Sequence, residues 1–288
     1  MPVLEAKNIT YVYSPNTPFE KVAMDGVSVS IEKGDFIGII GHTGSGKSTF
    51  VQHLNGLLRP TSGQVLLNGQ DIWAEPKKIR GVRFQVGMVF QYPEHQLFED
   101  TVSKDIAFGP RNMGLSEQEV EERVRGAARA VGLAEELLEK SPFELSGGEK
   151  RRVAIAGVLA MKPEVLILDE PTAGLDPRGR DMILRLIAEY HRQTGATVLL
   201  VSHSMEDVAL VCEKVLVMDH AKVAMFDRTE AVFSRAEELT DIGLAIPAVT
   251  RVVMLLREKG IDVGENVYTV EQAAKRLLPL LKGGESHA

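Results

Sequence analysis

The sequence predicts an α/β protein with a parallel-sheet core, and three apolar runs are the main evidence. Residues 36–40 (FIGII), 165–168 (VLIL) and 197–201 (TVLLV) are apolar segments of strand length. Strands without polar alternation are typical of a parallel sheet covered on both faces. Helix-start signals follow the second and third runs, at Asp176-Pro177 and at Ser204. Alternation of strands and helices is the pattern of a parallel α/β fold.

A second, antiparallel β subdomain is expected beside this core. Residues 2–33 have the character of short strands, with a break at Ser14-Pro15-Asn16. Residues 64–73 alternate in polarity and turn at Asn68-Gly69, a strong hairpin signal. Residues 86–90 (VGMVF) form a further strand-type run.

The middle of the chain is predicted to be helical. Residues 114–160 have helical spacing, and we expect a helical subdomain over about residues 92–160. Ser116 with Glu119 matches the capping box, in which two residues three positions apart satisfy each other's backbone N–H at a helix start. Gly132 is placed to end that helix. The expected main domain spans residues 1–234, and residues 235–288 form a small helical extension with apolar patches at 239–244 and 249–256.

Composition excludes several classes of protein. The chain has 288 residues and a net charge of −7, which disfavours nucleic acid as a partner. The single cysteine, Cys212, rules out an intrachain disulfide and is interpreted as a core residue. The N-terminus has no signal-peptide pattern, and no apolar run is long enough to span a membrane. We therefore expect a cytosolic chain, or one held at a membrane only through a partner.

The segment from Gly41 to Ser48 (GHTGSGKS) matches the phosphate-binding pattern G-x-x-x-x-G-K-[ST] at every fixed position. Backbone N–H groups of such a loop, and the helix that follows it, form an anion site. Lys47 adds a full charge for the terminal phosphates, and the Ser48 hydroxyl is suited to Mg²⁺. A plain glycine-rich turn would need neither side chain. The motif predicts a nucleoside triphosphate with magnesium, bound by Gly41, His42, Thr43, Gly44, Ser45, Gly46, Lys47, Ser48 and Thr49.

A second helix start has the properties of an anion site. Ser146 and Glu149 form another capping box, and Gly147 and Gly148 leave the first-turn N–H groups open to a ligand. An ordinary capped helix with flexible glycines explains the segment equally well on its own. One bound nucleotide does not require two such sites in one chain.

The order of six motifs resembles that of the ATP-binding-cassette ATPases over residues 3 to about 230. The motifs are GHTGSGKS, Gln91 after VGMVF, LSGGE, VLILDEP, AGLD at 173–176 and VSH at 201–203. The resemblance implies a P-loop NTPase core of the RecA-like type. It also implies that two cassettes pair head to tail, with ATP between the phosphate loop of one and the LSGG helix of the other.

Further segments are similar to the ATP-binding subunits of energy-coupling factor transporters, which take up vitamins and transition-metal ions in prokaryotes. These segments are residues 91–102 (QYPEHQLFEDTV), 108–116 (FGPRNMGLS) and 145–161 (LSGGEKRRVAIAGVLAM). Glu149 departs from the glutamine that is usual in the cassette family, but it can still complete the capping box.

The resemblance implies a set of partners and a location. The partners are a second cassette, identical or related, a transmembrane scaffold subunit and a substrate-binding membrane subunit, and the location is the cytoplasmic face of the membrane. The transported solute is not determined by this chain. For residues 235–288 we expect contact with the second cassette, through an apolar face of Leu244, Ile246, Val249 and Val253.

The same resemblance assigns roles to two acidic residues. Asp169 ends an apolar strand at the carboxyl edge of the sheet, where ligands of such folds bind, and is assigned to Mg²⁺. Glu170 is the candidate that polarises the attacking water. Helix capping is the alternative role for this pair. Phosphoryl transfer depends mainly on positioning and charge neutralisation, so a carboxylate with Lys47 and Mg²⁺ is a sufficient minimal set.

The remaining candidates also follow from the motif order. His203 is expected to contact the γ-phosphate, and Gln91 to reach Mg²⁺ and the water. Tyr13 is assigned to adenine stacking, with Tyr11 as the alternative. Asp176 is expected to touch the second cassette. We interpret four histidine side chains as surface or packing groups, those of His42, His53, His95 and His191. No local spacing of histidine, cysteine and carboxylates predicts a zinc site.

Three other functions fit parts of this pattern. An ATPase of a different importer class, one that takes up amino acids or metals with a periplasmic binding protein, is one alternative. A soluble cassette protein in translation or DNA repair usually carries two cassettes or a long coiled coil, and this chain has neither pattern. A non-catalytic ATP-binding regulator is disfavoured because Lys47, Asp169, Glu170 and His203 are all present.

Overall fold

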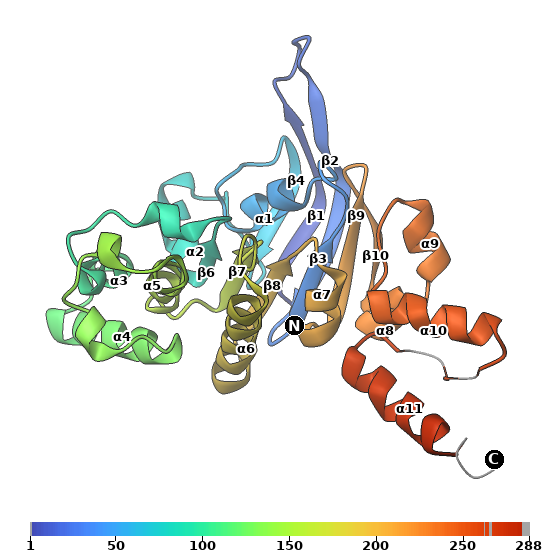
Figure 1. The fold of residues 1–288 in the computed structure, drawn as a ribbon. Coiled ribbons are helices and arrows are strands. Elements are labelled where there is room, and N and C mark those ends of the chain that lie inside the picture. Colours follow the sequence, from blue (N-terminus) through green and yellow to red (C-terminus); the bar gives the residue numbers. More distant parts are fainter. Residues whose placement is uncertain (1, 262, 265–266, 284–288) are drawn as a thin grey trace.

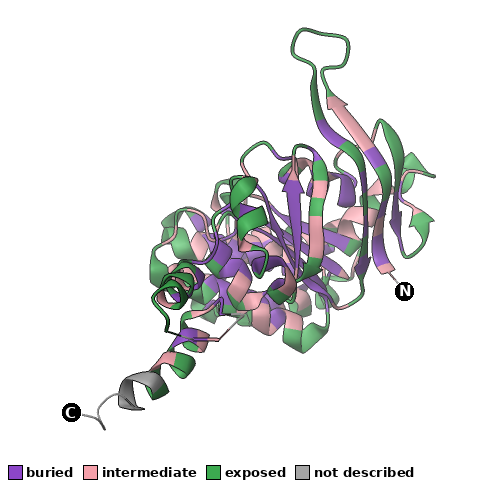
Figure 2. Ribbon diagram, turned by 90° about the vertical axis from the view of Figure 1, so that its right-hand side faces the viewer, coloured by how far each residue is buried: buried purple, intermediate pink, exposed green. Residues whose placement is uncertain are grey.

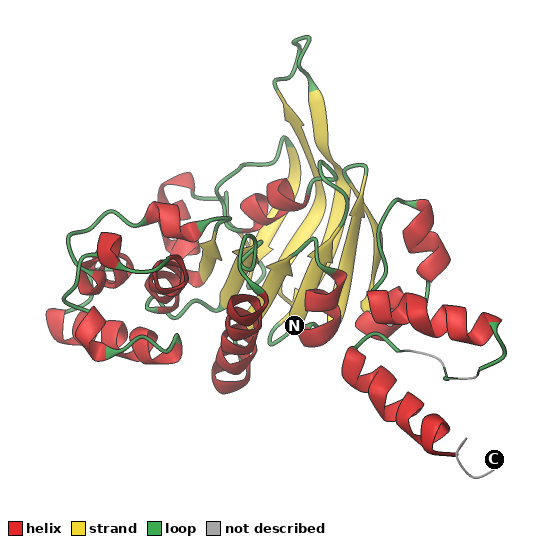
Figure 3. Ribbon diagram, viewed as in Figure 1, coloured by secondary structure: helices red, strands yellow, loops and turns green. Residues whose placement is uncertain are grey.

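A computed structural model describes residues 2–261, 263–264 and 267–283. In this part of the chain, the core is a six-stranded sheet in the order β10-β9-β3-β8-β7-β6 (Figures 1 and 3). The strands from β9 to β6 are parallel, and β10 pairs antiparallel with β9. The α/β prediction is confirmed. The strands are β3 (Phe36–Ile40), β6 (Val86–Val89), β7 (Val165–Asp169), β8 (Thr197–Val201), β9 (Lys214–Asp219) and β10 (Lys222–Arg228).

Both faces of this sheet are buried, which explains the apolar runs. Alternate residues of β7 enter different core clusters, Leu166 and Leu168 on one face and Val165 and Ile167 on the other. Helices α6 (Pro177–Thr194) and α7 (Met205–Val211) contribute to the first cluster. Helix α1 (Lys47–Leu54) and the second sheet contribute to the other cluster, so the central sheet lies between two layers.

The second sheet is antiparallel, in the order β2-β1-β4-β5. Its strands are β1 (Pro2–Tyr13), β2 (Lys21–Glu32), β4 (Ser62–Leu67) and β5 (Gln70–Asp71). The expected short strands are instead two twelve-residue strands, whose pairing contains several register shifts. The exposed end of this hairpin projects from the body of the molecule (Figure 2). Asn68 and Gly69 form the predicted turn, both with positive φ.

Helices precede and follow the edge strand β6 along the chain and form the part of the molecule opposite the C-terminus in Figure 1. Both predicted capping boxes are present, Ser116 with Glu119 and Ser146 with Glu149, and Gly132 has the left-handed conformation that ends a helix. The helices are η1 (Pro76–Lys78), α2 (Ile79–Gln85), η2 (Pro93–Gln96), α3 (Val102–Asn112), α4 (Glu117–Ala130), η3 (Glu135–Leu137), η4 (Pro142–Glu144) and α5 (Gly147–Leu159).

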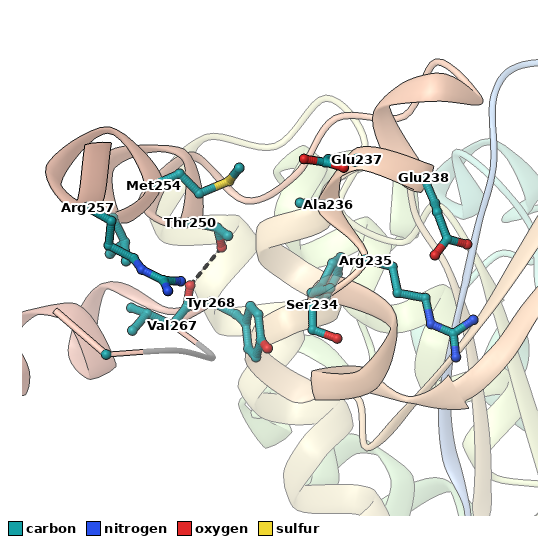
Figure 4. Close-up of a pocket in the computed structure, with 13 residues that line it drawn as sticks. Ser234, Arg235, Ala236, Glu237, Glu238, Thr250, Met254, Arg257, Val267 and Tyr268 are labelled. Atoms are coloured by element: carbon teal, nitrogen blue, oxygen red, sulfur yellow. Dashed lines mark hydrogen bonds between the residues drawn. The ribbon is translucent and has the colours of Figure 1, made fainter. Parts of the chain in front are cut away.

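The C-terminal segment contains α8 (Thr229–Phe233), α9 (Ala236–Asp241), α10 (Ala248–Glu258) and α11 (Val270–Gly283). A pocket separates α8 and α9 from α10, and Thr250 Oγ1 donates to the Val267 carbonyl at its edge, 2.8 Å away (Figure 4). Residues 262, 265–266 and 284–288 of the expected extension lie outside the described part. No helix in the described ranges is long and apolar enough to cross a membrane.

The prediction that Leu244, Ile246, Val249 and Val253 form an apolar contact face in this extension is wrong. Leu244 and Ile246 are buried in the main core, and Val253 is buried in a small cluster that Val249 also packs against. These side chains hold the extension to itself and to the main domain. The large apolar side chains left exposed on α10 are Val252, Met254 and Leu255.

Candidate nucleotide-binding and catalytic site

The phosphate loop joins β3 to α1, and its glycines are required by close approach. At Gly41 a Cβ would collide with the Met218 carbonyl of β9. At Gly46, where φ is 108°, a Cβ would come within 2.6 Å of the Ala23 carbonyl. Only glycine combines this space requirement with such backbone angles. The loop is therefore clamped between the end of β9 and the antiparallel sheet.

Lys47 is buried within this loop, with 6% of its surface exposed. Its Nζ donates to the carbonyl oxygens of Gly41, at 2.7 Å, and His42, at 3.1 Å. Burial lowers the pKa of the Lys47 ammonium, while the negative charges of Glu170 and Asp169 oppose that shift. A buried cation held only by carbonyl oxygens and two nearby carboxylates is well placed to pair with an anion that enters the loop.

Asp169 and Glu170 lie at the carboxyl end of β7. Burial raises the pKa of Asp169, and a hydrogen bond from Ser48 opposes the shift. Burial, followed by the charge of Asp169, raises the pKa of Glu170 to about 7. Glu170 has a φ of 52°, unusual for a residue with a side chain, and its Oε1 is buried without a hydrogen-bond partner. Backbone strain and an orphaned carboxylate oxygen are features that concentrate at functional sites.

His203 follows β8 and lies beside Glu170. Its Nε2 is 3.5 Å from Glu170 Oε1, too far for a strong hydrogen bond. Burial, followed by the charge of Lys47, lowers the pKa of His203. The ring is therefore neutral near pH 7 and has one N–H with which to donate.

These groups line one pocket of about 340 Å³, within the range of small-molecule sites. Predicted residues that the structure brings together here are Tyr13, Thr43, Gly44, Gly46, Lys47, Ser48, Thr49, Gln91, Asp169, Glu170 and His203. Gly41, His42 and Ser45 belong to the loop but not to the lining. The Ser45 hydroxyl is buried without a partner, and the His42 ring turns away to Asp219, with 2.9 Å between Nε2 and Oδ1.

Sequence reasoning missed Lys21, Ala23 and Val201, which also line the pocket. Lys21 lies near the projecting end of β2, and its Nζ is 3.6 Å from the position that a Cβ of Gly44 would occupy. It therefore adds a second cation at the mouth of the loop. No local pattern marks this lysine, because the pairing of β1 with β2 is what carries it to the loop.

The LSGGE segment lies elsewhere in the chain. Ser146 and Glu149 complete their capping box, with 2.6 Å between Ser146 Oγ and Glu149 Oε2, and no atom lies within 4 Å of a Cβ built at Gly147 or Gly148. The N-terminus of α5 is thus open to a ligand. Neither these residues nor Asp176, which caps α6 through its bond from the Gly179 N–H, line the phosphate pocket.

Comparison with known proteins gives the family. A family model described as ABC transporter matches residues 24–173. The energy-coupling factor transporter ATP-binding protein EcfA2 of Clostridium acetobutylicum is 54% identical over 99% of this chain and 100% of its own length. The protein of the same name from Listeria monocytogenes is 48% identical, over 98% and 99%. The chain belongs to the ATP-binding proteins of energy-coupling factor transporters.

Solved structures agree with this assignment to the energy-coupling factor family. The cbiO1 protein of Clostridium perfringens, described as part of the ABC transporter complex cbiONQ, has a TM-score of 0.75 and 39% identity, over 89% of this chain and 99% of that one. The cassette MJ0796, in a dimeric post-hydrolysis state with ADP and Pi, has a TM-score of 0.70 and 26% identity, over 78% and 98%. The fold of this energy-coupling factor cassette is therefore that of ABC ATPases.

The two tyrosines near the mouth of the pocket differ in this energy-coupling factor cassette. Tyr13 lines the pocket, is 38% exposed and shares a 3.2 Å hydrogen bond with Thr49 Oγ1. Tyr11 packs edge-on against Tyr13 and His53 and is partly buried in the core. Of the two rings, Tyr13 has the free surface that a stacked base requires.

The residues of this site also fit a magnesium-bound triphosphate. Ser48 and Asp169 are hydrogen-bonded to each other and present hard oxygen ligands, which suit Mg²⁺. Buried oxygen atoms without partners, on Ser45 and Glu170, adjoin a lysine that is otherwise held by backbone carbonyls. The residues of this pocket are therefore of the kind that a triphosphate with Mg²⁺ would require.

Proposed function

We propose that this chain is the ATP-hydrolysing subunit of an energy-coupling factor transporter. In this proposal, closing and opening of a pair of cassettes around ATP drives uptake of a micronutrient, a vitamin or a transition-metal ion. The proposal rests on one observation, that the chain holds two separate parts of a nucleotide site. Lys47, Asp169, Glu170 and His203 meet around one pocket, whereas the open N-terminus of α5 lies outside it.

The chemistry assigned to the pocket is phosphoryl transfer to water. The loop amides, Lys47 and Lys21 hold the triphosphate and offset its charge. Ser48, Asp169 and Gln91 would hold Mg²⁺, which when bound neutralises charge on the transferring phosphoryl group. Glu170 orients the water and accepts its proton, and neutral His203 donates its N–H to the γ-phosphate. Tyr13 stacks on the adenine.

A second cassette completes the site in this account. The solved relative with ADP and Pi is dimeric, which supports pairing. The LSGGE helix start, with its free N–H groups, would meet the γ-phosphate held by the loop of the partner. Asp176 would lie at the same contact, and the exposed apolar residues of α10 add to it from residues 235–288. ATP favours the closed pair because it binds both halves, and hydrolysis removes that differential affinity.

Membrane partners fit a groove beside Gln91. Phe98 and Phe108 are 59% and 48% exposed and stack edge-on, with ring centroids 5.0 Å apart. With Phe84 and Phe90 they line a hollow between the β6 edge and the helical part. Because Phe90 adjoins Gln91, a helix of the transmembrane scaffold seated here would sense the phosphate pocket directly. A substrate-binding membrane subunit would complete the complex, with this chain peripheral on the cytoplasmic face.

The test is co-purification of this chain from membranes. We expect the chain to bring down a second cassette and two membrane proteins, with ATPase activity in the complex. Phe98→Asp should break association with the membrane proteins and leave ATP binding intact. Recovery of the chain with ribosomes or DNA, and without membrane proteins, would refute the transport function.

A further inference from the structure

Three potential metal ligands meet on the outer side of the phosphate loop, away from the pocket. His42 belongs to the loop, whereas Asp219 ends β9 and His220 begins the turn between β9 and β10. Their ligand atoms all lie within 4.8 Å of one another. No local spacing could predict this cluster, because His42 and Asp219 are separated by 177 positions.

The hydrogen bonds of His42 leave a ring nitrogen facing an acceptor. Its Nδ1 is 2.9 Å from the Thr43 carbonyl oxygen, which can only accept, so Nδ1 carries a proton. In the neutral ring, Nε2 then presents a lone pair to Asp219 Oδ1 at 2.9 Å. Two acceptors at that distance repel unless a proton or a cation lies between them. A histidine that donates one N–H to a backbone carbonyl is also the usual arrangement of a metal ligand.

Both histidines contact the same carboxylate oxygen of Asp219. His220 Nδ1 lies 2.7 Å from Asp219 Oδ1, the atom that His42 also faces. His220 has 84% of its side chain exposed and is free to adjust its ring. In tetrahedral coordination the ligand atoms stand about 3.4 Å apart, which requires only a small movement.

The turn that presents His220 has an unfavourable sequence for its shape. Asp219 pairs with Lys222, so His220 and Ala221 form a two-residue turn, with φ of 42° and 65°. Asparagine and glycine are the residues that this turn favours. The Ala221 N–H donates to the Ser45 carbonyl at 3.1 Å, so the turn is docked on the phosphate loop. The strained turn holds His220 where it faces His42, with ring centroids 5.2 Å apart.

We propose that His42, Asp219 and His220 form a binding site for a divalent transition-metal ion of the Zn²⁺ or Co²⁺ class, which ties the phosphate loop to the β9–β10 turn. Two imidazoles and one carboxylate are the ligand set of such ions, and a water would fill the fourth position. Hard ions such as Mg²⁺ prefer oxygen ligands, so this site is chemically distinct from that of Ser48 and Asp169.

The experiment is a Co²⁺ titration of the tag-free chain, followed by visible absorption, with excess Mg²⁺ and no nucleotide. Excess Mg²⁺ competes for the oxygen ligands of the nucleotide pocket, so Co²⁺ that stays bound reports on imidazole ligands. We expect one equivalent of Co²⁺ with the strong absorption of four-coordinate geometry, displaced by Zn²⁺. We also expect Zn²⁺ to raise the temperature of unfolding, because it binds only the folded chain.

Two variants and a control make the assignment specific. His220→Asn suits the left-handed turn, leaves the nucleotide pocket untouched and should weaken Co²⁺ binding by at least about tenfold. Asp219→Asn should do the same. His95→Asn removes another exposed histidine and should change nothing. Absence of Co²⁺ absorption from the wild type, or equal binding by wild type and His220→Asn, would overturn the proposal.

Discussion

Arg151 forms a buried, two-pronged ion pair with Glu94, and the same guanidinium holds the loop after Glu170. Its Nε and Nη2 donate to the Glu94 carboxylate at 2.9 and 2.6 Å. Its Nη1 donates to the carbonyl oxygens of Pro171, at 3.1 Å, and Ala173, at 2.7 Å. One side chain of α5 thereby connects the LSGGE helix, the segment after Gln91 and the loop after Glu170. The three parts should move together when the pocket fills.

Replacing Arg151 should strongly destabilise the chain. Arg151→Met leaves the Glu94 carboxylate and two carbonyl oxygens unpaired, and breaking a buried pair from one side costs about 3–5 kcal/mol. Urea unfolding measures the change in the free energy of unfolding. The matched control is Arg125→Met, which breaks exposed pairs with Glu121 and Glu135 and should cost no more than about 1 kcal/mol for each pair. Equal costs for the two variants would mean that Arg151 is not a connecting element.

Glu170→Gln should bind ATP but lose turnover. The amide has nearly the same shape, so the pocket survives, but it cannot accept the proton of the attacking water. A positioned base typically contributes about 10²–10⁴-fold, so we expect kcat to fall by at least about a hundredfold. Steady-state ATPase and nucleotide-binding assays on one preparation separate the two effects. Glu122→Gln, on the exposed side of α4, is the control, and normal turnover by Glu170→Gln would remove Glu170 from its assigned role.

The raised pKa of Glu170 determines whether kcat/KM for ATP hydrolysis rises or falls with pH. A base works as the carboxylate, and its pKa in the free protein is about 7, so kcat/KM should rise with pH through about 7. Initial rates across a pH series give the kcat/KM profile. A flat kcat/KM between about pH 6 and 8 would contradict the assignment of Glu170 as the base.

Tyr13, and not Tyr11, should control affinity for the base of the nucleotide. Loss of a stacked ring costs about 1–3 kcal/mol, so Tyr13→Ala should raise the Kd for ATP by roughly ten- to a hundredfold. Tyr13→Phe keeps the ring and should bind normally. Tyr11→Ala should instead lower thermal stability, because Tyr11 packs against His53 and the core. If calorimetric titration showed weakened ATP binding for Tyr11→Ala and normal binding for Tyr13→Ala, the two roles would be exchanged.

Local signals predicted much of this fold, and long-range contacts account for the rest. The runs at 165–168 and 197–201, the two capping boxes and the Asn68-Gly69 turn depend on neighbouring residues alone, so they were readable from the sequence. The lengths of β1 and β2 depend on their mutual pairing.

The same division holds for the site. Motif order was enough to identify residues such as Lys47 and Glu170, which the structure places around one pocket. Lys21 reaches that pocket only through the hairpin, and Arg151 meets Glu94 only because α5 packs on η2. The positive φ of Glu170 is likewise a product of tertiary structure, as no local pattern requires it.

The shared nucleotide site is tested most directly by Ser146→Arg in the Glu170→Gln background. Sedimentation measures the mass of the species that the chain forms when ATP and the second cassette of its membrane complex are present. We predict that Glu170→Gln pairs with the second cassette when ATP is present. The double variant should still bind ATP in its own loop but pair far more weakly, because the arginine blocks the α5 N-terminus. Undiminished ATP-dependent pairing by the double variant, together with normal turnover by Ser146→Arg alone, would contradict the account.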